Sequence, residues 1–207
     1  VTTTDELIPS GETSSYRSNP LGLAEFTLSR KDPAYVGLAK EIHKAQEALM
    51  DGKDPVTVKP ELAEIMDEIH VQFPQAANDN IGFGSTIFAV KPGDGSAREQ
   101  AASCQKVLGG WANIANEYAT KRYRSNLINW GMLPFVIPDG DLPFTNHDYL
   151  FFPGIRKAVE EKAAEITGYV VDVNGLKPFT VTLGELTDEE RQIILKGCLI
   201  NYNRVEK

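Results

Sequence analysis

Apolar side chains recur at three-to-four-residue spacing in two stretches of the first third of the chain. The first stretch follows Asp32-Pro33, an N-cap and a proline at the first helical position, and it ends at Gly52. The second stretch extends from about Pro60 to Phe73. Because this spacing places apolar residues on one face of a helix, we predict two amphipathic helices that pack on an apolar layer.

The segments on either side of these helices have different patterns. Residues 2–18 are rich in Thr, Ser, Gly and Pro, which predicts loop and short strand. Residues 81–90 are rich in β-branched and aromatic side chains, which favours a buried strand. A glycine turn follows at residues 91–95, and Ser96-Ala97-Arg98-Glu99 then has the form of a capping box. We therefore predict a strand, a glycine turn and a helix N-terminus in succession.

The rest of the chain alternates between strand and helix patterns. The expected elements are a strand near 111–115, a helix through 126, a strand at 133–137, a helix near 156–167, strands at 169–173 and 178–183, and a helix capped by Thr187 with Glu190 three residues later. The chain has no internal repeat, low-complexity tract or clear linker. We predict a single α/β domain over residues 1–207.

Charge and cysteine content narrow the classes of function. The 207 residues include 21 Lys and Arg against 29 Asp and Glu, a net charge of −8, so bulk electrostatics repel nucleic acid and anionic membranes. Any anion that binds has to meet a local positive site. Cys104 and Cys198 are too far apart in sequence for a disulfide framework or a metal cluster, which favours a reduced, cytoplasmic or organellar compartment.

The glycine turn and the helix after it carry the strongest candidate chemistry. A helix N-terminus offers unpaired N–H groups and partial positive charge, which attract carboxylates and phosphates. The same groups would stabilise an alkoxide at Ser96, and Arg98 would grip a carboxylate with its planar fork. The alternative is structural: Ser96 is only a helix cap, and Arg98 is only a solvated residue of the first turn.

Several motifs occur in an order that is typical of one family. They are Thr3-Thr4-Asp5-Glu6-Leu7-Ile8-Pro9-Ser10-Gly11, Tyr16-Arg17-Ser18-Asn19, Gly93-Asp94-Gly95-Ser96-Ala97-Arg98-Glu99-Gln100-Ala101, Arg124-Ser125-Asn126-Leu127, Gly131-Met132-Leu133-Pro134 and Gly197-Cys198-Leu199-Ile200-Asn201. With these motifs, nearly the whole chain resembles the C-terminal swivel domain of the aconitase family. The resemblance implies a swivelling β/β/α domain, with a mixed sheet flanked by helices.

The resemblance also implies a function and roles for individual residues. Members of the family are hydro-lyases that remove and add water on a hydroxy-tricarboxylate such as citrate. By motif position, Ser96 would be the base, Arg17 and Arg98 would each hold a substrate carboxylate, and Gly95 and Ala97 would line the substrate. A [4Fe-4S] cluster would act as Lewis acid at the hydroxyl, held by N-terminal domains of the same enzyme, while this chain itself holds no metal.

Some positions depart from the family pattern. Ala97 stands where a second serine is usual, and Gln100 stands where histidine is usual. The insertion-like helices at residues 31–73 also lengthen the chain between Arg17 and the glycine turn. The substrate class therefore stays open. The chain is expected to be part of a longer enzyme, with a separate small subunit, as in isopropylmalate isomerase, or a non-catalytic anion-binding module as alternatives.

The remaining polar candidates favour structural roles. His43 and His70 lie on predicted helices without a ligand-spaced partner, and His147 is expected in a turn. Cys104 falls on the apolar side of a predicted helix, where a free cysteine behaves as a small hydrophobe. A group of basic residues forms either a patch toward the anion site or a solvated helix face: Lys121, Arg122 and Arg124.

Overall fold

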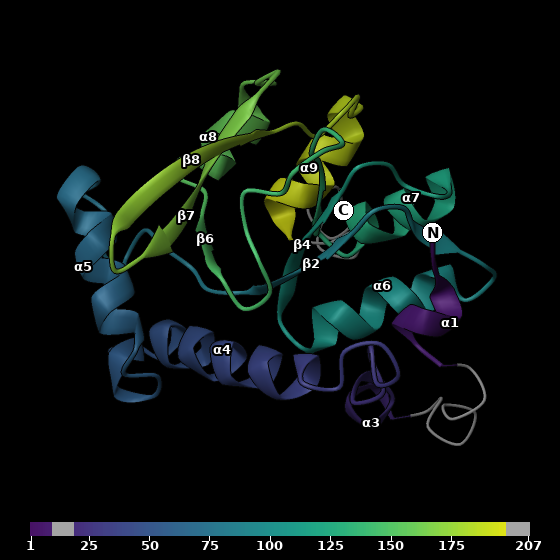
Figure 1. The fold of residues 1–207 in the computed structure, drawn as a ribbon, viewed down its shortest axis with the longest axis horizontal. Coiled ribbons are helices and arrows are strands. Elements are labelled where there is room, and N and C mark those ends of the chain that lie inside the picture. Colours follow the sequence, from purple (N-terminus) through teal and green to yellow (C-terminus); the bar gives the residue numbers. More distant parts are fainter. Residues whose placement is uncertain (10–18, 198–207) are drawn as a thin grey trace, which may run out of the picture.

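Helices and strands of both parallel and antiparallel sheets build the fold (Figure 1), and the computed structural model describes residues 1–9 and 19–197. The first half contains β1 (Thr2–Thr3), α1 (Thr4–Leu7), α3 (Pro20–Ala24), α4 (Tyr35–Met50), the 3-10 helix η2 (Pro55–Thr57), α5 (Leu62–Gln72), β2 (Ser85–Ala89) and β3 (Pro92–Asp94). The second half contains α6 (Arg98–Val107), β4 (Gly110–Ala115), α7 (Lys121–Asn129), β5 (Leu133–Val136), β6 (Tyr149–Phe151), α8 (Ile155–Glu160), β7 (Ile166–Asp172), β8 (Gly175–Val181) and α9 (Asp188–Lys196).

A parallel sheet with the strand order β2-β4-β5 forms the centre of the fold. Helix α6 precedes β4, and α7 connects β4 to β5. Because the strand order advances in one direction, right-handed crossovers place both helices on the same face of the sheet. Helices α6 and α7 accordingly pack against each other, and their apolar sides meet α1, α3 and α4 in one core cluster.

A second, antiparallel sheet has the order β6-β7-β8 and forms a different layer. Its apolar side chains join β4, β5, α8 and α9 in a second core cluster. An antiparallel bridge between Val136 and Thr182 connects the end of β5 to the residues after β8. Helix α5 packs on this sheet through a third, smaller cluster around Ile69 and Val171. The predicted α/β architecture, a mixed sheet arrangement flanked by helices, is confirmed.

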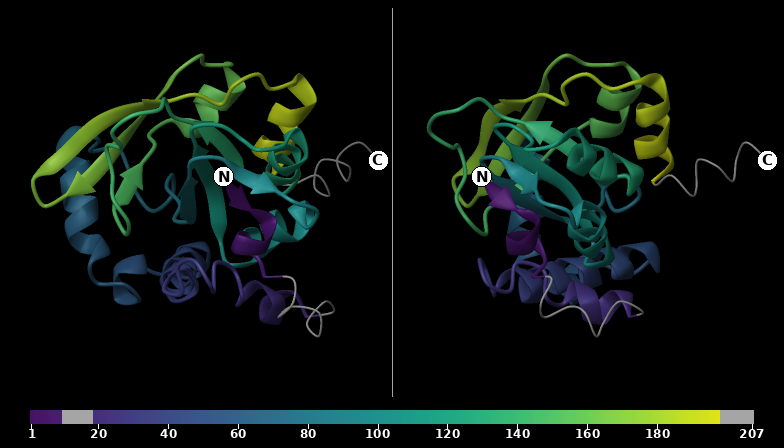
Figure 2. Two further views of the ribbon diagram at one scale, coloured as in Figure 1. Left: turned by 45° about the vertical axis from the view of Figure 1, so that its right-hand side comes forward. Right: turned by 90° about the vertical axis from the view of Figure 1, so that its right-hand side faces the viewer.

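Helix α4 lies along the side of the molecule opposite α8 and α9, and α5 stands at one end beside β7 and β8 (Figure 1 and Figure 2). Together α4 and α5 are called the strap below. A groove of about 1070 Å³ lies between this strap and the two sheets, and it is mostly apolar. Lys59 is one of the lining residues, and its ammonium pairs with Glu41 of α4 and with Glu61. The Tyr149 hydroxyl of β6 donates to Glu61 at 2.7 Å, so the strap is tied to the antiparallel sheet.

The structure differs from the sequence predictions at several element boundaries. The N-cap predicted at Asp32 is wrong, because α4 begins at Tyr35 and its N-cap residue is Ala34. The short strand β3 forms within the segment predicted as a glycine turn. Residues 4–7 form helix α1 within the segment predicted as loop and strand, and the Thr3 and Glu6 side chains cap it reciprocally. The helix predicted near 156–167 ends at Glu160, and β7 already begins at Ile166. The helix after the glycine turn begins at Arg98 rather than at Ser96. The capping box predicted at Thr187 and Glu190 is confirmed.

Three buried polar side chains close a ring of hydrogen bonds between α6, β4 and α7. The Gln105 amide donates to the Tyr123 hydroxyl at 2.9 Å, that hydroxyl donates to Asn113 Oδ1 at 2.6 Å, and Asn113 Nδ2 donates to Gln105 Oε1 at 2.6 Å. Each side chain is at most 1% exposed. Burial raises the pKa of the Tyr123 hydroxyl, which therefore stays a donor. The closed ring fixes the two helices relative to the sheet.

We expect Tyr123→Phe to lower the free energy of unfolding by about 1–3 kcal/mol, because Asn113 Oδ1 loses its hydroxyl donor inside the core. Urea denaturation followed by circular dichroism measures this loss. Tyr169→Phe is the matched control, since Tyr169 is partly exposed and its ring contact with Phe73 is kept. That variant should stay within about 0.5 kcal/mol of the parent. Equal stabilities for the two variants would show that the ring contributes nothing.

Candidate active site

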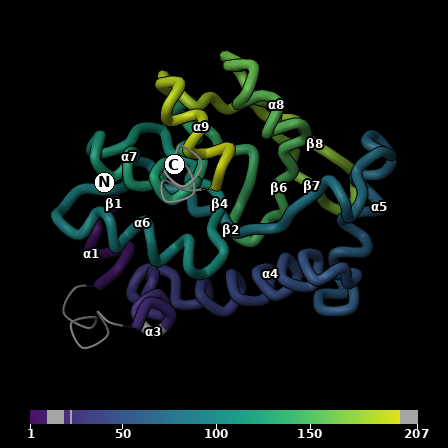
Figure 3. The backbone as a smooth tube through the Cα atoms, turned by 180° about the vertical axis from the view of Figure 1, so that it is seen from behind, coloured from purple at the N-terminus to yellow at the C-terminus, as the bar shows by residue number. Residues whose placement is uncertain are grey.

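The glycine turn lies beyond the carboxyl end of β2, at an edge where open α/β sheets bind ligands. Gly93 has a φ of +100° and Gly95 a φ of +125°, a backbone conformation that other residues rarely adopt. The chain turns sharply at both glycines and enters α6 at Arg98. Seen from behind, β1, α1, α6 and α7 lie together on one side of the molecule (Figure 3).

The N-terminal segment holds one side of this turn. Strand β1 pairs in parallel with β3, with Thr2 opposite Pro92 and Thr3 opposite Asp94. A Cβ atom at Gly95 would overlap the hydroxyl of Thr4, which is 4% exposed. Two motifs that lie about ninety residues apart in the sequence are therefore in direct contact.

The start of α7 holds the other side of the turn. The Thr120 hydroxyl caps α7 by accepting from the Tyr123 N–H at 3.1 Å, and it donates to the Gly93 carbonyl at 3.2 Å. A Cβ atom at Gly93 would overlap the Tyr123 ring. The N-terminal ends of α6 and α7 thus flank the glycine turn, and both contribute partial positive charge there.

Ser96 occupies the exposed part of the turn, one residue before the N-cap position of α6. The predicted capping box of Ser96 with Glu99 is wrong, because the N-cap residue is Ala97 and it makes no side-chain cap hydrogen bond. The structural alternative for Ser96, a serine used only as a helix cap, is therefore excluded. Its hydroxyl group is accessible next to the positive end of a ten-residue helix.

Arg98 is the first residue of α6 and is partly buried. Its Nε atom is buried and finds no hydrogen-bond partner among residues 1–9 and 19–197. A buried guanidinium N–H without a partner is costly, so a ligand with acceptor oxygens would be stabilised there. Arg98 is therefore not simply a solvated residue of the first turn, which was the structural alternative from the sequence.

Other candidates from the sequence lie elsewhere or outside the described residues. Arg17 and Cys198 fall in segments 10–18 and 198–207, outside the part of the chain that the structure describes. Arg124 serves the fold, because its Nη2 donates to the carbonyls of Leu183 at 3.0 Å and Glu185 at 2.7 Å. The basic patch therefore does not include Arg124, while Lys121 and Arg122 are exposed at the start of α7.

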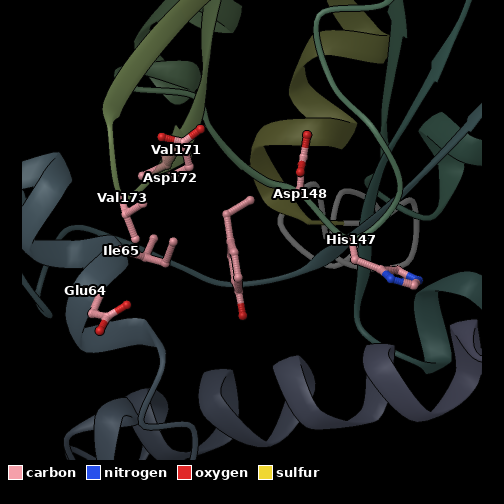
Figure 4. A pocket seen from close by; sticks show the side chains of 8 residues that line it. Glu64, Ile65, His147, Asp148, Val171, Asp172 and Val173 are labelled. Atoms are coloured by element: carbon pink, nitrogen blue, oxygen red, sulfur yellow. The ribbon is translucent and has the colours of Figure 1, made fainter.

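The three histidines lie away from the glycine turn in the sequence, and the contacts of His43 and His70 are with residues near them in the chain. The His43 ring lies 3.1 Å from the Glu47 carboxylate, and the His70 ring lies 2.6 Å from the Ala76 carbonyl. His147 occupies a turn with a φ of +71°, beside a small pocket against α5 and β7, and its ring points away from Glu64 across that pocket (Figure 4). Within the described ranges, no group of three or more His, Cys, Asp or Glu side chains is arranged to hold a metal ion.

Cys104 is buried in α6, and this burial raises the pKa of its thiol to about 11. The thiol is therefore protonated and unreactive near neutral pH, as expected of a cysteine that packs as a small hydrophobe. The part of the chain that the structure describes contains no helix long and apolar enough to span a bilayer.

Comparison with known proteins supports the family resemblance. The family model "Aconitase C-terminal domain" matches residues 66–140, which include the glycine turn, α6 and α7 but not the opening motifs. A crystal structure of 3-isopropylmalate dehydratase from Methanocaldococcus jannaschii is similar in fold, with a TM-score of 0.52 and 20% sequence identity over 99% of this chain and 87% of that chain. No curated protein sequence matches significantly. The resemblance to the aconitase C-terminal domain is thereby confirmed for the segment that carries the glycine turn.

We expect Gly95→Ala to destabilise the protein more than Gly140→Ala, although the two glycines have almost the same φ, +125° and +126°. A Cβ atom at Gly140 meets open space, whereas one at Gly95 overlaps the Thr4 hydroxyl. The additional loss should be about 1–3 kcal/mol, measured by urea denaturation.

Thr4→Ala in the Gly95→Ala background should recover part of this loss, because it removes the overlapping hydroxyl. Equal destabilisation by the two glycine variants would contradict a close contact between the turn and α1.

Proposed function

We propose that this chain forms one wall of the active site of a hydro-lyase that removes and adds water on a small hydroxy acid with several carboxylates. The observation that carries the proposal is the presence of two groups on one turn. One is the accessible Ser96 hydroxyl, and the other is the Arg98 guanidinium with its buried, unpartnered Nε. The match to the aconitase C-terminal domain over this same turn supports the proposal.

Ser96 is proposed as the base. Its oxygen accepts the proton from a carbon next to a substrate carboxylate, while hydroxide leaves the neighbouring carbon and a carbon–carbon double bond forms. The proton and the hydroxide together make one water. A serine accepts such a proton only when its alkoxide is stabilised, and the N-terminus of α6 and the charge of Arg98 supply that stabilisation.

Arg98 is proposed to bind a substrate carboxylate through its planar fork of donors. Gly95 and Ala97 are proposed to line the substrate on the strength of the family motif, although the space that a Gly95 side chain would need is filled by Thr4. Arg17 remains the proposed ligand of a second carboxylate, on the strength of the family motif. An overall charge of −8 makes these local cations necessary for binding an anionic substrate.

The iron–sulfur cluster that the resemblance implies does not fit the residues of this chain. A [4Fe-4S] cluster is normally held by four cysteine thiolates, and the sequence has two cysteines. Cys104 is buried in α6, and this burial raises the pKa of its thiol. We propose that a partner carries the cluster, as preceding domains of the same enzyme or as a separate larger subunit.

The substrate is proposed to be a tricarboxylate of the citrate and isocitrate type or a related alkyl-malate. Ala97 places a methyl group where the family usually has a second hydroxyl, which removes one hydrogen-bond donor from the turn. An alkyl-malate has fewer polar groups to satisfy than citrate. The fold shared with a 3-isopropylmalate dehydratase is compatible with this second class.

We expect Ser96→Ala, in the enzyme assembled with its cluster-bearing partner, to lower kcat by about 10²–10⁴-fold, because the proton acceptor is lost. The ultraviolet absorbance of the unsaturated acid follows the reaction with citrate, isocitrate and 3-isopropylmalate as probes. The melting temperature should not change, since Ser96 is exposed and caps no helix.

Ser103→Ala is the matched control. Ser103 lies on the same helix, its hydroxyl is 3.4 Å from the Gln100 carbonyl, and its removal should leave kcat within about twofold. Near-parental turnover in the Ser96 variant would exclude Ser96 as the base.

A further inference from the structure

Helix α6 begins without a side-chain cap from its own N-terminal residues, because its N-cap residue is Ala97. The first N–H groups of a helix have no partner within the helix, and a buried one is costly. Ser96 and Asp94 precede the helix, but neither provides the cap hydrogen bond. A different part of the chain takes over this role.

The side chain of Asn126, on α7, reaches the first turn of α6. With its amide oriented so that donors face acceptors, its oxygen accepts from the Glu99 N–H at 3.0 Å and its nitrogen donates to the Arg122 carbonyl at 2.6 Å. The opposite orientation would place oxygen against oxygen and nitrogen against N–H, so the hydrogen-bond pattern selects one orientation. Asn126 thus caps α6 from a neighbouring helix.

This arrangement affects Ser96. Serine at the start of a helix readily accepts a backbone N–H with its side-chain oxygen, which would shift the helix start and occupy a lone pair of that oxygen. Because Asn126 satisfies the Glu99 N–H, the helix begins at Arg98 and the Ser96 oxygen is left uncommitted. A proton acceptor needs such a free lone pair.

We infer that Asn126 is a positioning residue for the reaction: it anchors the first turn of α6 so that the Ser96 hydroxyl stays free and aligned with Arg98. This inference rests on the proposed role of Ser96 as the base. Asn126 itself touches the backbone at Glu99 and Arg122, and no contact with a substrate is required.

Asn126→Ala and Asn126→Asp, in the assembled enzyme, test the inference. Alanine removes both hydrogen bonds. Aspartate keeps the oxygen that accepts from the Glu99 N–H, where negative charge is favourable at a helix N-terminus, but it loses the hydrogen bond to the Arg122 carbonyl and faces that carbonyl with an oxygen. Hydrogen exchange at the Glu99 amide, followed by mass spectrometry, reports the cap directly. Asn129→Ala is the control, because Asn129 is exposed at the end of the same helix.

Asn126→Ala should increase exchange at Glu99 by about tenfold and lower kcat by about tenfold or more, with KM nearly unchanged. Asn126→Asp, which keeps only the bond to the Glu99 N–H, should exchange more slowly at Glu99 than Asn126→Ala and should recover part of kcat, and Asn129→Ala should change neither. A lower kcat with an unchanged KM would not be expected from a loss of stability alone. Rescue by the acidic variant also guards against an alanine variant that fails to fold.

Two results would overturn the inference. Unchanged exchange at Glu99 in Asn126→Ala would show that Asn126 does not cap α6. Faster exchange with unchanged kcat would show a cap that has no effect on the reaction. If Ser96→Ala alone leaves turnover unchanged, the proposed base fails and the positioning role fails with it, even where the exchange data confirm the cap.

Discussion

The geometry of the candidate site depends on one contact, between the ring of Tyr123 and the backbone of Gly93. The ring occupies the space that a side chain at position 93 would need, and the Tyr123 hydroxyl belongs to the closed hydrogen-bond ring with Gln105 and Asn113. A buried polar ring in which every member is satisfied allows only one arrangement of its elements. The glycine turn therefore lies on a surface whose position is set by the core, and Thr4 and Thr120 complete its support.

A rigid turn of this kind has a chemical consequence. The N-terminal end of α6 and the Arg98 guanidinium place positive charge beside Ser96, next to the carboxylates of Asp94 and Glu99, on a chain with a net charge of −8. The proposed anionic substrate would meet this charge at Arg98. Neither Ser96 nor Arg98 lines the large, mostly apolar groove beside the α4–α5 strap, and Lys59, which does line it, is paired with Glu41 and Glu61. The volume of this groove therefore does not make it the candidate active site.

Local signals predicted much of the fold. The apolar periodicity gave α4 and α5 to within two residues, and the Thr187 capping box gave the start of α9. The same Thr-x-x-Glu signal is present at Thr3 and Glu6, where it caps α1 within the segment predicted as loop and short strand. At Ser96 and Glu99 the signal was misleading, because Asn126 caps α6 from another helix. The three-residue β6 has little local pattern, since it exists through its pairing with β7. Sequence motifs identified Ser96 and Arg98 as candidates. The contacts of Thr4 with Gly95 and of Tyr123 with Gly93 could not be predicted, because they join segments that are far apart in the sequence.

The most direct test of this account is a crystal structure of the assembled enzyme with a bound hydroxy acid, citrate or 3-isopropylmalate. The account predicts a substrate carboxylate within hydrogen-bond distance of the Arg98 guanidinium, and Ser96 Oγ next to the carbon that loses its proton. It also predicts that the glycine turn keeps its contacts with Thr4 and Tyr123. A ligand bound in the groove between the α4–α5 strap and the sheets, with the Ser96 turn empty, would contradict it.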